Sequence, residues 1–276
     1  MKPTAWTPLE ASLEEIRARF AAPLLALARG AVPAFVLRQI YPPAHCKALM
    51  HRFAARGLLY DPTQAGDGTP HRVDIGTSFG HHRANREEFF AHAAQTHALF
   101  STLFEGYQDP VQTMYAALAG LAPDKKVMTA RELDGRLYGP AIFRIYHESL
   151  GHRPHYDSVA KRARAFEYAA AHFEHQFAAV LCFQNASDMR AGGEPFLYNC
   201  PYTPQLDEVL SGHTFAPYVA RNGIERVQVQ LEPGDLYFFF SENIHEVPPV
   251  QGEQPRAVLA IFFALSPEHE EIFVWA

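Results

Sequence analysis

The spacing of apolar residues divides the chain into two parts. Over residues 1–137, apolar positions recur every three or four residues, which is the period of helices with one buried face. Helices are predicted over four segments of this part: 13–27, 45–57, 87–104 and 111–121. Pro23 should kink or end the first helix, and Gly57 should close the second. A short β-like run at 35–37 precedes the second helix, and the composition of 61–69 is typical of a loop.

From about residue 138 the pattern changes to short runs of β-branched and aromatic residues separated by Gly, Pro, Asn and Asp. The runs are AIFRIYH, AAVLCFQN, EPFLYN, RVQVQL, DLYFFF and RAVLAIFFAL. This pattern indicates an antiparallel sandwich or barrel, and the fully apolar runs indicate strands that are buried on both faces or lie beneath helices. We therefore predict a single α+β, mainly β domain with a jelly-roll core over 138–265. A mostly helical part, 1–137, should pack against the core, and 266–276 should form a tail.

Composition narrows the classes of function. The chain has 276 residues and a net charge of −6, and it lacks a run of basic residues, which argues against nucleic-acid binding. Most of the 24 basic residues are arginines, which suit forked recognition of carboxylates. The three scattered cysteines give no disulfide framework. With 15 histidines, a metal site made of imidazole and carboxylate stays open.

The N-terminal segment MKPTAWTPLEASLEEIRARF has Pro and acidic residues where a secretion signal needs a positive stretch and then an apolar one. No stretch approaches the roughly 18 uncharged apolar residues of a membrane span. We therefore expect a cytoplasmic protein with neither a membrane nor a nucleic acid as partner.

Two segments carry candidate metal ligands, FRIYHESLGHRPHYDS and PGDLYFFFSENIHEVPPVQGEQPRAVLAIFF. In the first, His155 and Asp157 follow a predicted strand, and strand alternation points both side chains to one face. In the second, His245 lies just past the strand DLYFFF, and Arg256 opens the next strand. Two histidines and one carboxylate on one face of an octahedral metal leave three positions open, as in non-haem Fe(II) oxygenases.

With these four residues in order on predicted strands, the chain resembles the Fe(II)/2-oxoglutarate-dependent dioxygenases over roughly residues 138–265. The resemblance implies that the jelly roll is a double-stranded β-helix. It also implies that His155, Asp157 and His245 hold Fe(II), which 2-oxoglutarate chelates before O2 binds. Arg256 would then bind the far carboxylate of 2-oxoglutarate.

The chain departs from the family pattern at one position, and another position bears on the reaction. Many relatives have Ser or Thr two residues after the arginine, whereas this chain has Val258, so the additional contact to 2-oxoglutarate must come from elsewhere. Tyr146 is our candidate, with a core aromatic as the alternative. Relatives that halogenate have a small residue where this chain has Asp157, and chloride fills the vacated site. The carboxylate therefore favours hydroxylation, although desaturation or ring closure would use the same ligands.

The stretches HYDS, GGEPFLYN and 245–256 are similar to bacterial enzymes that act on free or N-acylated aliphatic amino acids, such as N-succinyl derivatives. That group also includes amino-acid halogenases. Such substrates carry carboxylates, so further arginines are needed, and the candidates are Arg83, Arg162 and Arg164. For each of them, an exposed surface position is the alternative. Phe262 should line the substrate pocket or pack in the core.

Two other functions remain open. The stretch AFVLRQIYPPAHCKALMHRF is similar to the entrance of prolyl-hydroxylase-like members, so a peptidyl or protein hydroxylase is the second hypothesis. A non-catalytic jelly-roll binding module is the third, although such a module has no reason to keep all four residues. The sequence also leaves room for a homodimer.

The remaining motifs are interpreted as structural features and not as functional sites. His172 and His175 are expected to share a helix face on the surface, and Gly192 and Gly193 to form a tight turn between strands, because no phosphate-loop lysine or helix follows them.

Overall fold

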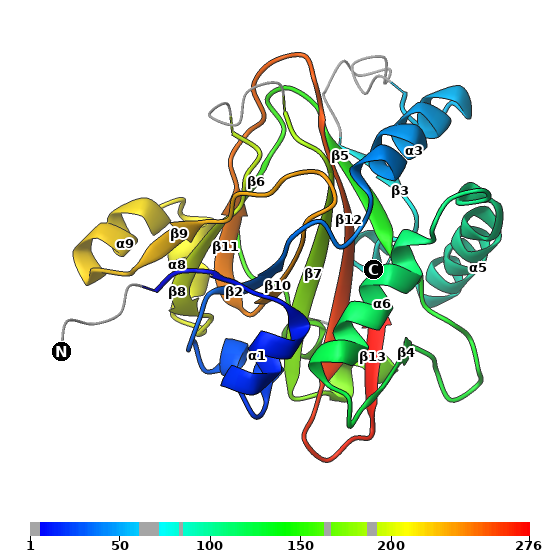
Figure 1. Ribbon diagram of the computed structural model, residues 1–276. Helices are drawn as coiled ribbons and strands as arrows, with labels where there is room; N and C mark the ends of the chain where they lie inside the picture. Colours follow the sequence, from blue (N-terminus) through cyan, green and yellow to red (C-terminus); the bar gives the residue numbers. More distant parts are fainter. Residues whose placement is uncertain (1–5, 61–71, 83–84, 163–166, 187–191) are drawn as a thin grey trace.

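Two β-sheets face each other, and helices cover the outer face of the larger sheet (Figure 1). This computed structural model describes residues 6–60, 72–82, 85–162, 167–186 and 192–276. The larger sheet consists of β1 (Leu9–Glu10), β2 (Ala34–Leu37), β3 (Val73–Ile75), β4 (Lys126–Thr129), β5 (Ile142–Tyr146), β7 (His175–Gln184), β10 (Leu236–Phe240), β12 (Arg256–Leu265) and β13 (Glu271–Trp275). The smaller sheet consists of β6 (His152–His155), β8 (Phe196–Pro201), β9 (Arg226–Gln228) and β11 (Asn243–Val247). The predicted α+β jelly roll is confirmed.

The order of the strands shows how distant segments meet. The larger sheet runs β1-β2-β10-β7-β12-β13-β4, with β5 paired to β12 and β3 paired to β5. The smaller sheet runs β6-β11-β8-β9. Both sheets therefore bring a strand from the middle of the chain, β5 or β6, beside a strand from near its end, β12 or β11.

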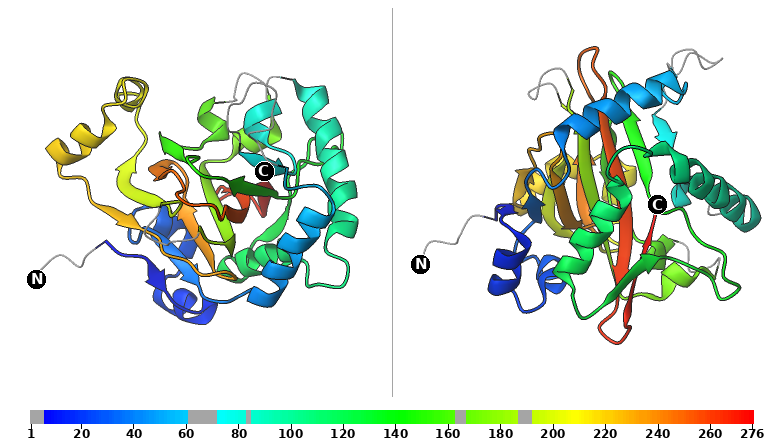
Figure 2. Two further views of the ribbon diagram at one scale, coloured as in Figure 1. Left: turned by 90° about the horizontal axis from the view of Figure 1, so that it is seen from above. Right: turned by 45° about the vertical axis from the view of Figure 1, so that its right-hand side comes forward.

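The helices lie in two groups on either side of the sheets. The described helices are α1 (Leu13–Arg19), α2 (Pro23–Ala28), α3 (Pro43–Ala55), α4 (Phe79–His82), α5 (Arg86–Leu103), α6 (Pro110–Leu121), α7 (Val159–Arg162), the 3-10 helix η3 (Ala169–His172), α8 (Leu206–Ser211) and α9 (Phe215–Asn222). Figures 1 and 2 show α3, α5 and α6 against the larger sheet, with α8 and α9 projecting on the opposite side.

Local sequence signals explain most helix boundaries. The predicted segment 13–27 forms two helices, because Pro23 occupies the first turn of α2, where its missing N–H costs nothing. Ser12 and Glu15 form a capping box at the start of α1. Asp109 caps α6 by accepting hydrogen bonds from the first free N–H groups. Gly57 follows α3 with φ of +67°, a conformation that glycine adopts without strain.

The apolar strands are buried on both faces, as predicted. On β12, the side chains of Leu259, Ile261 and Phe263 join the core beneath the helices. Alternate residues of the same strand, Val258 and Ala260, face the space between the sheets. The helix-facing side of β12 is thus large and apolar, whereas its inner side carries the small Val258 and Ala260 between Arg256 and Phe262.

Three regions differ from the sequence-based expectation. Residues 266–276, expected as a tail, contain β13, which pairs with β12 and β4 and buries Trp275 completely. The segment 206–222, for which no element was predicted, forms α8 and α9. The predicted loop at 61–69 lies outside the described residues.

No helix in the described ranges combines the length and apolar character needed to cross a membrane.

The aromatic core between helices and sheet gives a stability prediction. The ring of Phe143 lies 4.7 Å from that of Phe53 and 4.9 Å from that of Phe183, centroid to centroid. Phe143→Ala should lower the free energy of unfolding by about 3–5 kcal/mol, because it leaves a cavity where two layers meet. Urea denaturation measures this. Leu133→Ala, at a fully exposed position, should change it by less than about 0.5 kcal/mol, and equal effects would contradict this packing.

Candidate metal centre

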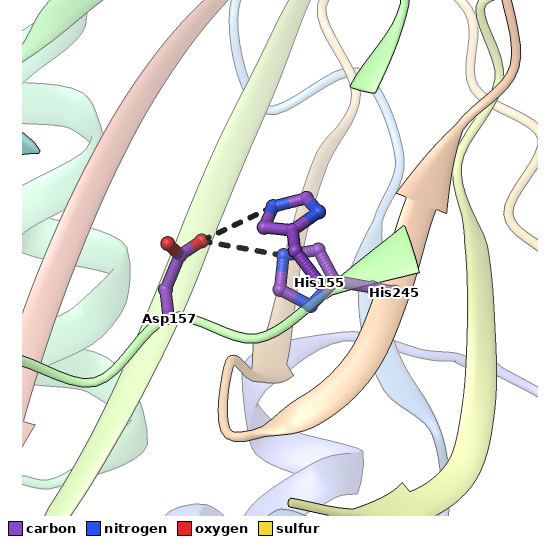
Figure 3. Close-up of side chains that lie close together, drawn as sticks. All are labelled: His155, Asp157 and His245. Atoms are coloured by element: carbon purple, nitrogen blue, oxygen red, sulfur yellow. Dashed lines mark ion pairs between the residues drawn. The ribbon is translucent and has the colours of Figure 1, made fainter. Parts of the chain in front are cut away.

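His155 and His245 lie opposite each other on two strands of the smaller sheet. β6 ends at His155, and the antiparallel register pairs this residue with His245 in β11. Residues in this relation project to the same face, so both imidazoles enter the space between the sheets. Asp157 follows β6 by two residues, and its carboxylate turns to the same point (Figure 3). His245 thus lies within a strand of its own, and not merely past the end of DLYFFF.

The three side chains fit one divalent cation. Asp157 Oδ2 lies 3.5 Å from His155 Nε2 and 3.3 Å from His245 Nε2. Ligands on neighbouring corners around one ion are about 3 Å apart when each bond is about 2.0–2.2 Å long. All three ligand atoms lie within 4.8 Å of one another, and no other such His, Cys, Asp or Glu group occurs in the part of the chain that the structure describes.

Backbone contacts hold these ligands in place. The Nδ1 atom of His245 donates to the carbonyl of Asn243 at 2.9 Å, and that of His155 to the carbonyl of Arg153 at 2.7 Å. These bonds turn each Nε2 toward the position of a cation. Nε2 of His155 also lies 2.7 Å from Nδ1 of His152, a contact that a bound cation would replace. The backbone N–H of Asp157 donates to the carbonyl of Ser241 at 2.9 Å, and the Ser241 hydroxyl donates back to the Asp157 carbonyl at 3.0 Å.

The electrostatics match the protonation states that metal binding needs. Burial alone would raise the pKa of Asp157, but contacts with His155 and His245 hold the pKa of this carboxyl well below its usual range. Burial, and then the adjacent His245, lowers the pKa of the His155 imidazole. Asp157 is therefore ionised and His155 neutral, the forms in which these groups bind metals. His152, whose ring lies 3.7 Å from that of His155, has its pKa lowered to about 2, chiefly by burial.

Arg256 is a buried cation whose guanidinium N–H groups are not used by the described residues. It is 4% exposed, and its guanidinium makes no hydrogen bond or ion pair with the described residues. The nearby Glu194 is buried, and neither of its carboxylate oxygens has a hydrogen-bond partner among the described residues; burial raises the pKa of this carboxyl, against the opposing effect of the Arg256 charge. An anion that enters this space would therefore meet an available guanidinium fork.

Tyr146 lies beside this cation. The β5–β12 register places it opposite Arg256, and the guanidinium carbon lies 5.7 Å from the centre of the tyrosine ring. Arg72, which pairs with Asp74, lies 5.6 Å from the same ring. The proposed contact of Tyr146 with 2-oxoglutarate stays a prediction.

Two glycines let the chain pass close to Arg256. Gly192 and Gly193 have φ of +86° and +83°, so each favours glycine. A Cβ on Gly193 would lie 3.0 Å from Cδ of Arg256, and one on Gly192 would lie 2.0 Å from the carbonyl oxygen of Pro249. Both glycines are therefore close-approach points, whereas the tight turn between strands stays a prediction because residues 187–191 lie outside the described ranges.

The metal centre opens into a small cavity of about 50 Å³. Its walls include the three ligands, Arg256 and Phe262, while its floor consists of small apolar residues of the larger sheet. These floor residues are Ala178, Val180, Val258 and Ala260. A larger hollow of about 530 Å³ lies between α1, α2 and the loop after α6, remote from these groups. The cavity at the metal centre is therefore identified as the candidate site by the chemistry of its lining residues and not by its volume.

Of the four residues predicted to bind the substrate, only Phe262 has a described side chain. Arg83 and Arg164 lie outside the described residues, and so does the side chain of Arg162. Phe262 lines the cavity, as expected for a substrate-pocket residue.

Sequence reasoning missed Arg144, which also lines the cavity. Its signal was a single charge in the apolar run AIFRIYH, two residues before Tyr146 and therefore on the same face. The shared helix face expected for His172 and His175 is wrong, because His172 ends η3 and His175 begins β7.

Comparisons with known proteins were made on the whole chain. Residues 9–276 match the family described as the carrier-protein-independent halogenase WelO5. The structure is similar to that of an N-substituted L-amino acid dioxygenase from Burkholderia ambifaria AMMD, with a TM-score of 0.63 and 17% identity over 93% of this chain and 91% of that chain. A second structure of that dioxygenase, in complex with alpha-KG, gives a TM-score of 0.59 and 18% identity at the same coverage. At such identity the likeness shows a shared fold. No curated protein matches.

A metal titration tests the centre. His245→Ala should weaken Co(II) binding by more than about 100-fold, because it removes a direct ligand, and even the loss of an outer contact typically costs 10–100-fold. Anaerobic Co(II) absorption titration measures this affinity. The matched control is His172→Ala, at an exposed histidine in η3, which should bind Co(II) like the parent. Equal affinities in the two variants would rule out His245 as a ligand.

Proposed function

The chain belongs to the family of the carrier-protein-independent halogenase WelO5, and from this premise we propose that it is an Fe(II)- and 2-oxoglutarate-dependent oxygenase that hydroxylates an unactivated C–H bond. The substrate we propose is a small molecule with a carboxylate, a free or N-acylated aliphatic amino acid such as an N-succinyl derivative. The observation that carries the proposal is the convergence of His155, Asp157 and His245 beside the unpaired cation of Arg256.

The residues fit the cofactors by their donor set. His155, Asp157 and His245 would hold Fe(II) and leave positions for 2-oxoglutarate and O2. When bound, these cofactors supply the oxidative chemistry, in which decarboxylation of 2-oxoglutarate to succinate and CO2 is coupled to transfer of an oxygen atom to the substrate. Arg256 would receive the far carboxylate of 2-oxoglutarate in a forked, charge-assisted pair.

The protein contributes position and enclosure. The carbonyl contacts at Asn243 and Arg153 fix the orientation of the two imidazoles, so their Nε2 atoms stay aimed at one point. The small residues Val258 and Ala260 leave room above the larger sheet for the cosubstrate. Burial of Arg256 strengthens its attraction for a carboxylate, because water screens the pair less there.

Asp157 favours hydroxylation, although the family is named for a halogenase. In the halogenating relatives a small residue stands at this position, and chloride takes the vacated place on the metal. Here the carboxylate lies 3.3 Å and 3.5 Å from the two histidine Nε2 atoms, so a halide would compete with a side chain that is already positioned. We therefore propose oxygen transfer as the outcome.

The proposed substrate class has two supports. The structurally similar protein from Burkholderia ambifaria AMMD is called an N-substituted L-amino acid dioxygenase. The cavity at the metal centre is lined by a second arginine, Arg144, and by the ring of Phe262, which suit a substrate with a carboxylate and an aliphatic segment. The peptidyl hydroxylase stays the second hypothesis.

Anaerobic addition of Fe(II) and 2-oxoglutarate tests the cosubstrate site. We expect the weak visible charge-transfer band of the chelate, and its absence despite bound iron would overturn the proposal. Arg256→Gln should raise the apparent Kd for 2-oxoglutarate roughly 10- to 100-fold, because it removes a charge-assisted pair. Arg221→Gln, at an exposed arginine of α9, is the control and should leave the Kd unchanged. A normal Kd in Arg256→Gln would move the carboxylate anchor elsewhere.

Product analysis tests the reaction. With N-succinyl and N-acetyl aliphatic amino acids in chloride buffer, mass spectrometry should find a product heavier by one oxygen atom, together with succinate. Asp157→Gly should abolish this product, because it removes a metal ligand and opens a position for chloride. A chlorinated product from the unaltered enzyme would contradict the proposed role of Asp157, and turnover with peptides alone would contradict the substrate class.

A further inference from the structure

A second cavity adjoins the metal centre. It has a volume of about 80 Å³, and Arg144, Asp157 and Phe262 form walls of both cavities. We call it the side cavity; the rest of its lining includes Phe79, Val159, Gln176 and Trp275. A space of this size accepts a few small groups, so it has room for one acid group of a substrate.

Arg144 brings a positive charge to the wall between the cavities. It is the third residue of β5, and its register partner is Val258, on the inner face of β12. Its Nε atom is buried and has no hydrogen-bond partner, and its guanidinium makes no ion pair with the described residues. Its contact is with the ring of Phe262, at 5.6 Å from the ring centre. Leaving a buried donor unsatisfied destabilises the fold, and a bound acceptor would recover this loss.

Trp275 supplies an independent observation in the same cavity. The residue is fully buried in β13, and its indole nitrogen has no hydrogen-bond partner in the described part of the chain. An indole N–H and a guanidinium can both donate hydrogen bonds, and neither can accept one. Two donors without acceptors therefore line one small space, and the ligand that complements both is an acceptor with negative charge.

Most other polar side chains of the side cavity are already engaged. The Oε1 atom of Gln176 accepts from the backbone N–H of Val159 at 2.6 Å, and the Ser158 hydroxyl donates to Glu242 at 3.3 Å. Asp157 is committed to the two histidines of the metal centre. The rest of the lining consists of apolar residues and of the small residues Ser78 and Gly80. A ligand that fits this lining has a carboxylate next to an aliphatic segment.

We propose that Arg144 and the indole N–H of Trp275 bind a carboxylate of the substrate, while its aliphatic chain lies against Phe262 and faces the metal centre. This assignment rests on the proposed function and adds the place where the substrate acid is held. It also explains how one small active site separates two carboxylic acids. Arg256 takes the cosubstrate, and Arg144, whose register partner Val258 lies two residues along β12 from Arg256, takes the substrate acid.

A single-tryptophan protein allows both ligands to be followed in one sample. The chain has two tryptophans, so Trp6→Phe leaves Trp275 as the sole indole reporter in the side cavity. This parent is loaded anaerobically with Fe(II) and 2-oxoglutarate, and the charge-transfer band reports the cosubstrate. N-succinyl-L-leucine and N-acetyl-L-leucine are then titrated, and the change in Trp275 emission reports their binding.

Arg144→Met removes the charge and keeps an unbranched side chain. We expect the apparent Kd of the acid probes to rise at least about 10-fold, while the Kd of 2-oxoglutarate changes less than about 3-fold. Arg144→Lys should restore part of the affinity, because it restores the charge. N-acetyl-L-leucinamide, which lacks the carboxylate, should bind the parent and Arg144→Met equally weakly. Unfolding temperatures of the variants confirm that they are folded.

Other outcomes of these titrations would contradict the proposal or the proposed function. A loss of 2-oxoglutarate affinity with unchanged probe binding would assign Arg144 to the cosubstrate and overturn the proposal. No emission change with either acid probe in the parent would overturn it as well. Absence of the charge-transfer band in the parent would instead refute the proposed oxygenase. For the indole N–H, Trp275→Phe followed by calorimetry should weaken acid binding about 3- to 10-fold, and unchanged binding would exclude Trp275.

Discussion

The pairing of β6 with β11 places two imidazoles opposite each other, and the position of every other group in the site follows from that register. A slip by one residue would turn either histidine to the other face of the sheet. Asp157 completes the set only because the two-way hydrogen bonding with Ser241 returns the chain after β6 to the start of β11. Residues far apart in sequence thus converge through backbone pairing, and the side chains need little local strain to meet.

The larger sheet supports this arrangement with both of its faces. Its helix-facing side carries large rings such as Phe143 and Phe263, which bind the helical layer to the sheet. On its inner side, the small residues Ala260, Val258 and Ala178 leave space for ligands between larger side chains such as Tyr237 and Phe239. The helices of the N-terminal half therefore affect the site indirectly. They pack against the larger sheet, from which Arg256 and Arg144 project.

Much of this could be predicted from sequence, and the failures have physical reasons. Proline and glycine marked the ends of α3 because their effects are local. β13 was missed because EIFVW becomes a strand only by pairing with β12 and β4, which no local signal announces. The convergence of His155, Asp157 and His245 was anticipated because strand alternation and the family resemblance both pointed to it, whereas the role of Arg256 stays a prediction. Arg144 was overlooked, although a single charge in a strand buried on both faces has to point into a cavity.

The two unpaired cations in the interior have a consequence for the energetics of the whole protein. Folding buries Arg256 and the Nε atom of Arg144, and each guanidinium lies over an aromatic ring without a hydrogen bond or ion pair to the described residues. The ligand-free fold therefore carries an electrostatic frustration that its sequence could have removed with two carboxylates. Binding of acids relieves this frustration, so the stability that the ligand-free protein lacks contributes to the affinity for acids. The protein thus trades stability of its ligand-free state for selective binding.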